Sequence, residues 1–545
     1  MAMSERCMTH RGAYQSVLAT LLVSGFAALI AFSPSRVSAL IPQETTAIVG
    51  VTIIDGNGGA PVENGAIVVR GERIIALGPA STVQVPQGAQ VIEGVGQYAT
   101  PGFIDTNVHM SLAFSWTETN AKYWSRNADL VLQGVQLHLK YGVTTVRDSY
   151  GALLPMMRVR DAIERGELVG PRMYVAGNIV GWGGPYSQTF SRIKEEELTL
   201  FEEQINDSIA LGSGEPWIHM TPSELRVAVN EYLDLGPDFI KYGGTSHQSY
   251  PSAIGFSPEA QRVLVEEVHK RGLVAETHST TLEGLRLSIL AGLDLVQHPE
   301  VVGHRVITDE LVDLMVERGV VCSILSNVYS GDAWQYRLSE REKARVALAE
   351  LEDGVIQRGT PRTTAEIRRI TQETGIAQPG SILGGGLEVR RESAIKLIAG
   401  GCTTTVGTDN LLFGYRGNAP EFTREEHVIS EHQKPGIGTI LGIEGLVELG
   451  MTPMQAIVAA TKNGAIASKA LEEYGTLEVG KLADILLLGA NPLSDISNIR
   501  DLRMVMKEGK LIDVGSLPTD PVTGDWEREG SDEEGRSNLP LPRPR

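Results

Sequence analysis

The stretch Tyr98-Ala-Thr-Pro-Gly-Phe-Ile-Asp-Thr-Asn-Val-His109 decides how the rest of the chain can fold. It begins with apolar residues typical of a strand and ends with polar side chains at alternating positions, namely Asp105, Asn107 and His109. Successive side chains on a strand point to opposite faces, so residues two apart share a face. We therefore expect Asn107 and His109 to look into one pocket from the end of a single buried strand.

Residues 99–470, which include this stretch, alternate apolar strands with amphipathic helices. The predicted strands are 103–104, 143–147, 173–176, 239–242, 274–278, 295–298, 320–324 and 403–407, and the predicted helices are 121–140, 223–235, 258–271, 282–291 and 310–317. Eight mostly apolar strands with helical crossovers predict an α/β fold, a closed parallel (β/α)8 TIM barrel. An open doubly wound sheet is the alternative, but no GxGxxG turn supports it.

The two ends of the chain have a different pattern. Residues 44–98 and 471–515 contain short alternating strands bounded by glycine and aspartate, which predicts one small β-sandwich domain assembled from both ends. Residues 516–545 are rich in Pro, Asp, Glu and Gly, a composition typical of a disordered tail. In the order of the sequence, the barrel domain at 99–470 is expected between the two segments that form the sandwich.

The first 39 residues resemble an export signal. Arg6 and Arg11 precede an apolar run at 17–32, and Val37-Ser38-Ala39 offers small residues for cleavage. The run is short for a membrane span, which needs about 20 residues. We predict a signal peptide at 1–39 and an exported protein, periplasmic or secreted, with an uncleaved anchor or a cytoplasmic chain as alternatives.

The composition excludes several classes of partner. The chain of 545 residues is 42% hydrophobic and 21% charged, as in soluble globular proteins, and its net charge of −19 disfavours nucleic acid and anionic membranes. Three cysteines provide neither a disulfide framework nor metal-ligand spacing. We expect a small-molecule substrate and no stable membrane partner after signal cleavage, and a homo-oligomer is left open.

Polar residues end or interrupt five of the predicted strands or follow them directly. They are Asn107, His109, Lys241, His278, His298 and Asp409. Each has an ordinary explanation by itself, such as a hydrogen-bonded loop histidine, a core lysine or a helix-capping aspartate. Active sites of TIM barrels lie at the C-terminal strand ends, so these side chains are expected to converge. Histidine, carboxylate and a modified lysine together suit zinc-like divalent metals.

These motifs resemble the amidohydrolase superfamily, in particular its imidazolonepropionase-like metal-dependent hydrolases. The resemblance rests on residues 101–109, 238–241, 276–278, 297–298 and 407–409, and on the closing segments 460–465 and 475–484. It implies two divalent metal ions, with zinc expected first and cobalt or manganese as alternatives. It also implies that Lys241 is an N6-carboxylysine that bridges them, with His109 on one metal and His278 and His298 on the other. Asp409 would bind metal and act as the general base.

The chemistry of these residue types agrees with that resemblance. A lysine buried in an apolar strand loses the solvation of its ammonium group, so its pKa falls and the free amine can capture CO2. A water held by the metals becomes hydroxide near neutral pH, and Asp409 can pass its proton to a leaving nitrogen. This chemistry predicts hydrolysis of a C–N or C–O bond at a carbonyl group, and the resemblance implies an amide, urea or carbamate C–N bond. A dipeptidase, an N-acyl amino acid hydrolase, a lactonase and an inactive binding protein are the alternatives.

Asn107 departs from the His-x-His that this superfamily usually has at this strand. An amide oxygen is a weaker zinc ligand than imidazole, so a binuclear site, a single tight metal and a damaged site all remain open. Asn-x-His resembles the phenylurea and molinate hydrolase branch, which implies amides, ureas or carbamates with bulky apolar groups.

Other side chains are weaker candidates. His247 and His304 are predicted substrate contacts, and aromatic residues near the loops are possible pocket walls or lid packing: Trp116, Tyr123, Trp182 and Tyr186. His138 is expected at the surface, and Arg147 is expected to form a structural ion pair with Asp148.

Overall fold

The computed structural model describes residues 44–111, 121, 123–191, 193–247, 252–303, 305–332, 334–335, 337–339, 342, 386–412 and 434–519. The predicted signal peptide, Trp116, His304 and residues 520–545 of the predicted tail lie outside these ranges. Within the described ranges, no helix is both long enough and apolar enough to cross a membrane.

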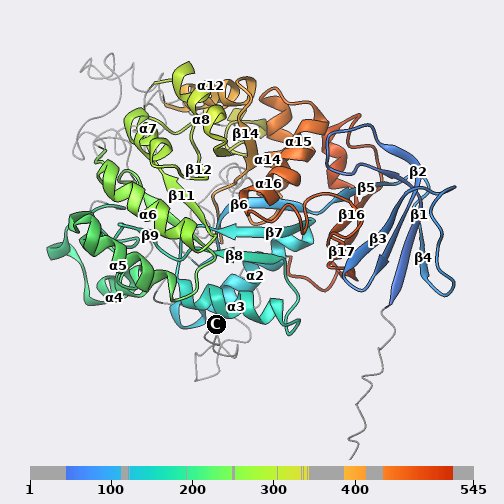
Figure 1. Ribbon diagram of the computed structural model, residues 1–545, viewed down its shortest axis with the longest axis horizontal. Coiled ribbons are helices and arrows are strands. Elements are labelled where there is room, and N and C mark those ends of the chain that lie inside the picture. The colour runs from blue at the N-terminus through green and yellow to red at the C-terminus, as the bar shows by residue number, and fades with distance from the viewer. Residues whose placement is uncertain are drawn as a thin grey trace, which may run out of the picture. The chain divides into compact units, whose positions relative to one another are not determined.

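Nine short parallel strands build the barrel (Figure 1). They are β6 (Phe103–His109), β7 (Val143–Asp148), β8 (Arg172–Val175), β9 (Ile179–Val180), β10 (Phe239–Gly243), β11 (Val274–His278), β12 (Leu295–Gln297), β13 (Val321–Ile324) and β14 (Thr403–Val406). Only residues 176–178 separate β8 from β9; β8 pairs with β7 while β9 pairs with β10, so together they act as one strand. All eight predicted strands are therefore present.

The barrel closes between its first and last strands. The Thr106 hydroxyl of β6 donates a hydrogen bond of 2.9 Å to the carbonyl oxygen of Val406 in β14. Directly after β14, the short strand β15 (Asn410–Leu411) pairs in parallel with the end of β6. The predicted closed α/β barrel is thus confirmed, and the ends of β6 and β14 lie side by side.

Helices connect the strands at the positions that the sequence pattern predicts. Matching the prediction are α2 (Asn127–Lys140), α5 (Pro222–Leu233), α6 (Pro258–Lys270), α7 (Leu282–Leu290) and α8 (Asp309–Arg318). The last four each begin after a Ser or Thr whose hydroxyl accepts a backbone N–H of the first turn. The described residues also form α3 (Leu153–Glu164), α4 (Leu200–Ala210), α12 (Gly386–Ala399), α14 (Ile437–Glu448), α15 (Pro453–Ala460) and α16 (Lys462–Ala467).

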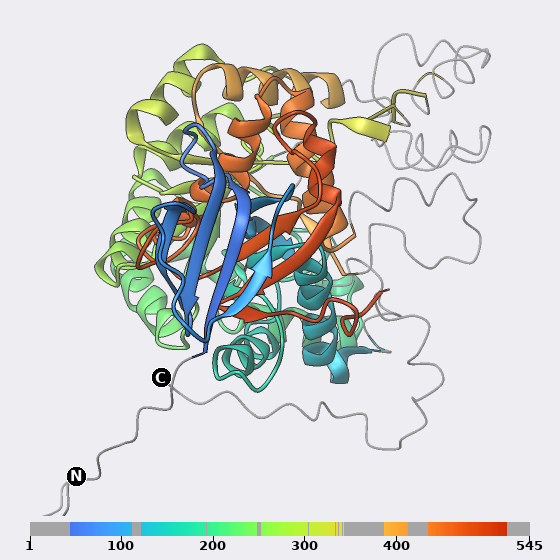
Figure 2. The same cartoon turned by 90° about the vertical axis from the view of Figure 1, so that its right-hand side faces the viewer.

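Strands from both ends of the chain form a separate sheet, seen as adjacent blue and red arrows in Figure 2. Its strands are β1 (Thr45–Ile53), β2 (Val62–Arg70), β3 (Arg73–Pro79), β4 (Gln90–Glu93), β5 (Tyr98–Pro101), β16 (Ile485–Leu488), β17 (Leu502–Lys507) and β18 (Lys510–Leu511). β1 pairs with β4 before Gly50 and with β5 after it. Gly50 has φ +75°, which a side chain would make costly, and the pairing of β1 with β2 shifts register there.

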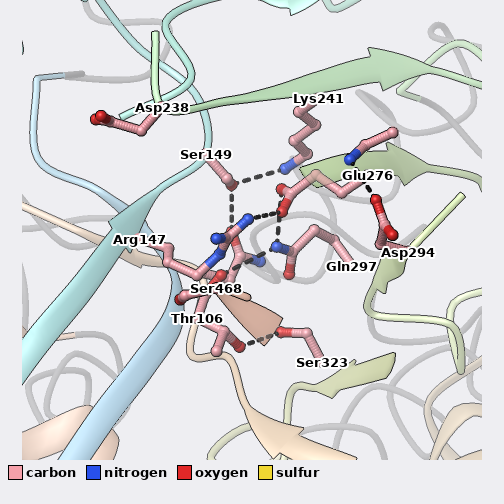
Figure 3. Close-up of polar contacts among 12 residues, drawn as sticks. Thr106, Arg147, Ser149, Asp238, Lys241, Glu276, Asp294, Gln297, Ser323 and Ser468 are labelled. Atoms are coloured by element: carbon pink, nitrogen blue, oxygen red, sulfur yellow. Dashed lines mark hydrogen bonds and ion pairs between the residues drawn. The ribbon is translucent and has the colours of Figure 1, made fainter. Parts of the chain in front are cut away.

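A layer of polar side chains fills the barrel interior below the strand ends (Figure 3). Arg147 is fully buried and donates to Glu276 over 2.7 Å, while its guanidinium lies 3.9 Å from the centre of the Phe239 ring. Gln297 donates to Glu276 over 2.9 Å and to the carbonyl oxygen of Thr106 over 3.0 Å. We call these four polar residues, Thr106, Arg147, Glu276 and Gln297, the barrel floor.

The predicted pairing of Arg147 with Asp148 is wrong. Adjacent residues of a strand point to opposite faces, so only Arg147 enters the barrel floor. Asp148 instead accepts the backbone N–H of Met110 over 2.8 Å. Burial raises the pKa of Asp148 to about 8, against the lowering effect of its hydrogen bonds.

Candidate active site

The six predicted ligand residues all lie at or near the C-terminal ends of barrel strands. Asn107 and His109 end β6, Lys241 lies in β10, and His278 ends β11; His298 follows β12, and Asp409 follows β14. All are buried except Asp409, whose side chain is 39% exposed. The barrel mouth therefore holds a buried donor set with one carboxylate accessible to solvent.

The first group of side chains surrounds Asp409. Its Oδ1 lies 2.8 Å from His109 Nε2 and accepts the Asn107 Nδ2 amide over 3.0 Å. Burial acts to raise the pKa of Asp409, but the charge and hydrogen bond of His109, with further contributions from His298 and Lys241, hold it well below its usual range. Asp409 is therefore ionised at neutral pH.

The local backbone aims the Asp409 side chain at these partners. Its backbone N–H donates to the carbonyl oxygen of Asn107 over 2.8 Å, and its φ of +55° lies in the left-handed region. Two residues earlier, a Cβ on Gly407 would lie 1.8 Å from the Ser323 hydroxyl. Only glycine therefore lets the chain pass close enough to β13 for this turn.

Ser149 connects the first group to Lys241, as Figure 3 shows for the lysine. The Lys241 Nζ donates to the Ser149 hydroxyl over 2.9 Å, and that hydroxyl donates to Asn107 Oδ1 over 2.6 Å. Ser149 was not among the site residues predicted from the sequence. Its place directly after β7, at the C-terminal end of the second barrel strand, is the signal that would have found it.

Lys241 has no ion-pair partner among the described residues, although its side chain is 1% exposed. The nearby carboxylate of Glu276 is bound by Arg147 instead. Burial lowers the pKa of Lys241, and the more distant charges of Glu276, Asp409 and Asp148 offset this only in part. The mouth therefore favours a neutral amine at this position.

His278 and His298 form the second group. His278 Nδ1 lies 3.1 Å from His298 Nε2, and the ring centres are 4.6 Å apart. Burial lowers the pKa of His298 to about 3 and that of His278 well below its usual value, so both rings are neutral, the form that binds metals. Within the described structure, His278 Nε2 is buried without a hydrogen-bond partner.

These two groups bring together the types of donor that divalent cations bind. The donors lie 2.8 Å apart in the first pair and 3.1 Å apart in the second, closer than the about 3.3 Å between tetrahedral ligands that lie 2.0–2.1 Å from zinc. No three His, Cys, Asp or Glu side chains of the described ranges converge on one point. The donors are thus arranged as two pairs, and Lys241 is the additional group that the same mouth offers.

An aromatic cluster lies against the second group. His247 stacks on Phe190 with ring centres 4.2 Å apart, and Trp182 lies 4.8 Å from the His278 ring. Trp182 and Tyr186 are 2% and 1% exposed, so they pack in this cluster instead of lining an open surface. The cluster immobilises one wall beside His278. His247, Trp182 and Tyr186 were predicted near the site from the sequence, whereas Phe190 was not.

One histidine lies elsewhere than expected. His138 was predicted at the surface but is fully buried in α2, and its Nδ1 lies 2.9 Å from the Gly134 carbonyl oxygen. His138 thus belongs to the buried side of α2, together with apolar residues such as Val135 and Leu139.

The comparisons with known proteins agree with this geometry. Residues 98–512 match the Amidohydrolase family. Two solved structures share the fold: molinate hydrolase, with 29% identity, a TM-score of 0.73 and coverage of 88% of this chain and 97% of that one, and phenylurea hydrolase B, with 27%, 0.74, 88% and 99%. Ochratoxinase from Aspergillus niger is 24% identical over 509 residues, 90% of each chain.

The fold and site define a TIM-barrel enzyme, a metal-dependent hydrolase of carbon–nitrogen bonds. The family match covers most of the barrel and extends into the terminal sheet, so the chain belongs to the Amidohydrolase family. The resemblance predicted from the strand-end motifs is confirmed, and the alternative of an inactive binding protein loses its support.

Proposed function

We propose that the protein hydrolyses amides, ureas or carbamates that carry a bulky apolar group. The observation that carries this proposal is the pairing of an Asn-x-His strand end with two neutral, buried histidines in one barrel mouth. It is further supported by the similarity to proteins whose names state action on molinate, on a phenylurea and on ochratoxin. The buried aromatic cluster beside His278 makes that wall of the mouth apolar and rigid.

The proposed ligands are His109, His278, His298, Asp409 and a carboxylated Lys241, which together would hold two divalent cations, with zinc expected first. Cations bound there supply Lewis acidity, which lowers the pKa of water and polarises a carbonyl group. Asp409 is ionised and half-exposed, so its carboxylate can accept a proton from the attacking water and deliver it to the leaving nitrogen. His247, beside His278, is the proposed substrate contact.

Carboxylation of Lys241 follows from the same surroundings. The neutral Nζ lone pair attacks the carbon of CO2, the N–C bond forms, and the proton lost from nitrogen passes to solvent. The product is an anion in place of a buried amine that has no ion-pair partner among the described residues. Its two oxygens are donors of the hard type that zinc and manganese accept.

Metal content and reconstitution test the proposed function. Purified enzyme is stripped with a chelator, reloaded with zinc, cobalt or manganese, and assayed on anilides, ureas, carbamates, N-acyl amino acids and lactones. We expect activity on the first three classes that disappears with the metal and returns on reloading. Less than one equivalent of bound metal, with no activity regained, would contradict the proposal.

Lys241→Ala tests the carbamate separately. We expect loss of bridging, fewer than two metals per chain and a fall in activity of about a thousandfold or more. A 13C NMR signal from enzyme supplied with labelled bicarbonate should vanish in this variant. Lys481→Ala is the control, because Lys481 is also buried but bonds to Thr476 in the segment before β16, away from the barrel mouth. Full activity of Lys241→Ala would refute the carbamate.

Export remains a proposal that rests on the sequence of residues 1–39. Cell fractionation followed by N-terminal sequencing of the mature protein tests it. A first residue near position 40 in the exported fraction is expected, and an intact N-terminus in the cytoplasm would refute it.

A further inference from the structure

Asn107 is hydrogen-bonded at both ends of its amide. Its Nδ2 faces Asp409 Oδ1 at 3.0 Å and its Oδ1 faces the Ser149 hydroxyl at 2.6 Å. An ionised carboxylate only accepts hydrogen bonds, so the amide atom that faces Asp409 must be the NH2 group. The amide oxygen therefore faces Ser149, which has its own proton to donate.

The hydrogen bond from Lys241 to Ser149 shows which way the other hydrogen bonds run. Its Nζ carries hydrogen as an amine and also as a carbamate, so it donates to Ser149 in either form. Because Ser149 accepts from Lys241, its single proton is left for Asn107 Oδ1. The bonds thus run in one sense, from Lys241 through Ser149 and Asn107 to Asp409.

We propose that Ser149 and Asn107 act as a positioning pair: the Ser149 hydroxyl binds the amide oxygen of Asn107, which turns the amide NH2 toward Asp409 and holds that carboxylate in place. In this arrangement Asn107 positions the general base, Asp409, and its amide oxygen does not bind a metal. This inference rests on the proposed function, in which Asp409 is the proton acceptor.

The backbone around the pair is rigid enough for such a role. The Ser149 N–H donates to the carbonyl oxygen of Val108 over 3.1 Å, which fixes Ser149 beside β6. The buried carboxylate of Asp105 accepts the N–H groups of Asn107 and Thr408 over 3.1 Å and 3.2 Å. The segments that bear Asn107 and Asp409 are therefore bound to one shared group.

The geometry also selects one oxygen of the carboxylate. His109 and Asn107 both contact Asp409 at Oδ1. Two contacts on one oxygen restrict rotation of the carboxylate about its terminal bond. Loss of the Asn107 donor, or of the hydroxyl that orients it, would free that rotation while leaving the imidazole ligands unchanged.

A double-mutant cycle tests the pair. Ser149→Ala, Asn107→Ala and the double variant are compared with wild type for kcat and KM on the best anilide of the panel. Hydrogen bonds to charged groups contribute about 1.5–3 kcal/mol, so each single variant should lose about 10- to 100-fold in kcat with KM little changed. Because the two residues act as one unit, the double variant should lose no more than either single one.

Cobalt binding to the apo-enzyme is the second readout, and it does not depend on turnover. Ser149→Ala and Asn107→Ala should change Co²⁺ affinity equally, and far less than His109→Ala does. Ser149→Thr keeps the hydroxyl and should retain most of the activity. Ser288→Ala is the matched control, since it removes an equally buried hydroxyl with a 2.8 Å hydrogen bond on α7.

The outcomes separate this inference from the proposed function. Additive losses in kcat, or a Co²⁺ affinity that falls tenfold further in Asn107→Ala than in Ser149→Ala, would overturn the positioning pair and make Asn107 a ligand. Wild-type enzyme that binds no Co²⁺ and hydrolyses none of the panel would instead overturn the proposed function, and the pair with it. A thermal melt of each variant shows whether it is folded. If Ser149→Thr does not fold, the cycle of Ser149→Ala, Asn107→Ala and the double variant still tests the positioning pair.

Discussion

The barrel floor and the barrel mouth are built from the same strands but treat polar groups in opposite ways. Arg147 and Ser149 lie two residues apart at the end of β7, and Glu276 and His278 lie two apart on β11, so each strand contributes one side chain to each layer. In the floor, Arg147 and Glu276 neutralise each other over 2.7 Å. In the mouth, Lys241 has no ion-pair partner within the described structure.

This difference shows how the ion-paired floor leaves the lysine of the mouth reactive. Glu276 is the carboxylate that contributes most to raising the pKa of Lys241, yet its hydrogen bonds go to Arg147 and Gln297. Because the floor binds that charge, the lysine above it is left to burial, which favours the neutral amine. Reactivity at the mouth therefore depends on the ion pair between Arg147 and Glu276 in the layer beneath.

The largest effect on activity should come from removing the Asp409 carboxylate from the mouth. Asp409→Asn keeps the shape of the side chain but removes the proton acceptor, so kcat should fall by about 10²- to 10⁴-fold. Steady-state kinetics measure this, and a thermal melt near that of wild type shows that the barrel is intact. Asp313→Asn, which changes an exposed carboxylate on α8, serves as the control. Retention of a tenth of the activity would remove Asp409 from the mechanism.

Breaking the floor should unfold the protein before it affects chemistry. Arg147→Met leaves Glu276 buried without a counter-ion, which costs about 3–5 kcal/mol of unfolding free energy. Urea unfolding measures this loss. The double variant Arg147→Met/Glu276→Leu removes both charges and should recover most of the stability. If the single variant is as stable as wild type, the floor is not the paired layer described above.

A smaller effect on stability is expected from a histidine that is buried outside the mouth. Burial lowers the pKa of His138 in α2 to about 4, against a usual 6.5. Between these values the unfolded chain binds more protons than the folded one, so stability falls as pH drops from 6.5 toward 4. The loss from this group approaches about 3 kcal/mol at the acid end, since each pKa unit corresponds to about 1.4 kcal/mol.

His138→Leu should therefore flatten the pH dependence of stability below pH 6.5. Unfolding free energies measured by urea at several pH values test this. Metal is removed from all samples, so that protonation of the site histidines does not release metal and change the stability in that way. His219→Leu changes an exposed histidine and should leave the slope as it is in wild type. An unchanged slope in His138→Leu would show that His138 is hydrated in solution.

Much of the architecture was predictable because the signals are local. Each barrel strand is a short apolar run, and the alternation of strands with capped helices appears in the residues themselves. The polar residues at strand ends were predictable for the same reason, since the C-terminal ends of parallel barrel strands meet at one mouth. The burial of His138 was not, because an amphipathic pattern does not state which neutral polar residue a helix turns inward.

The barrel, its family and the six side chains at the mouth could be predicted from the residues alone, because these follow from periodicity and from motifs within single segments. The pairing of these side chains becomes visible only in the folded chain. That Glu276 binds Arg147 and not Lys241, and that Ser149 and Asp409 bind opposite ends of the Asn107 amide, depends on distances between strands far apart in the chain. Such contacts are set by barrel closure and side-chain packing, which no single stretch of residues encodes.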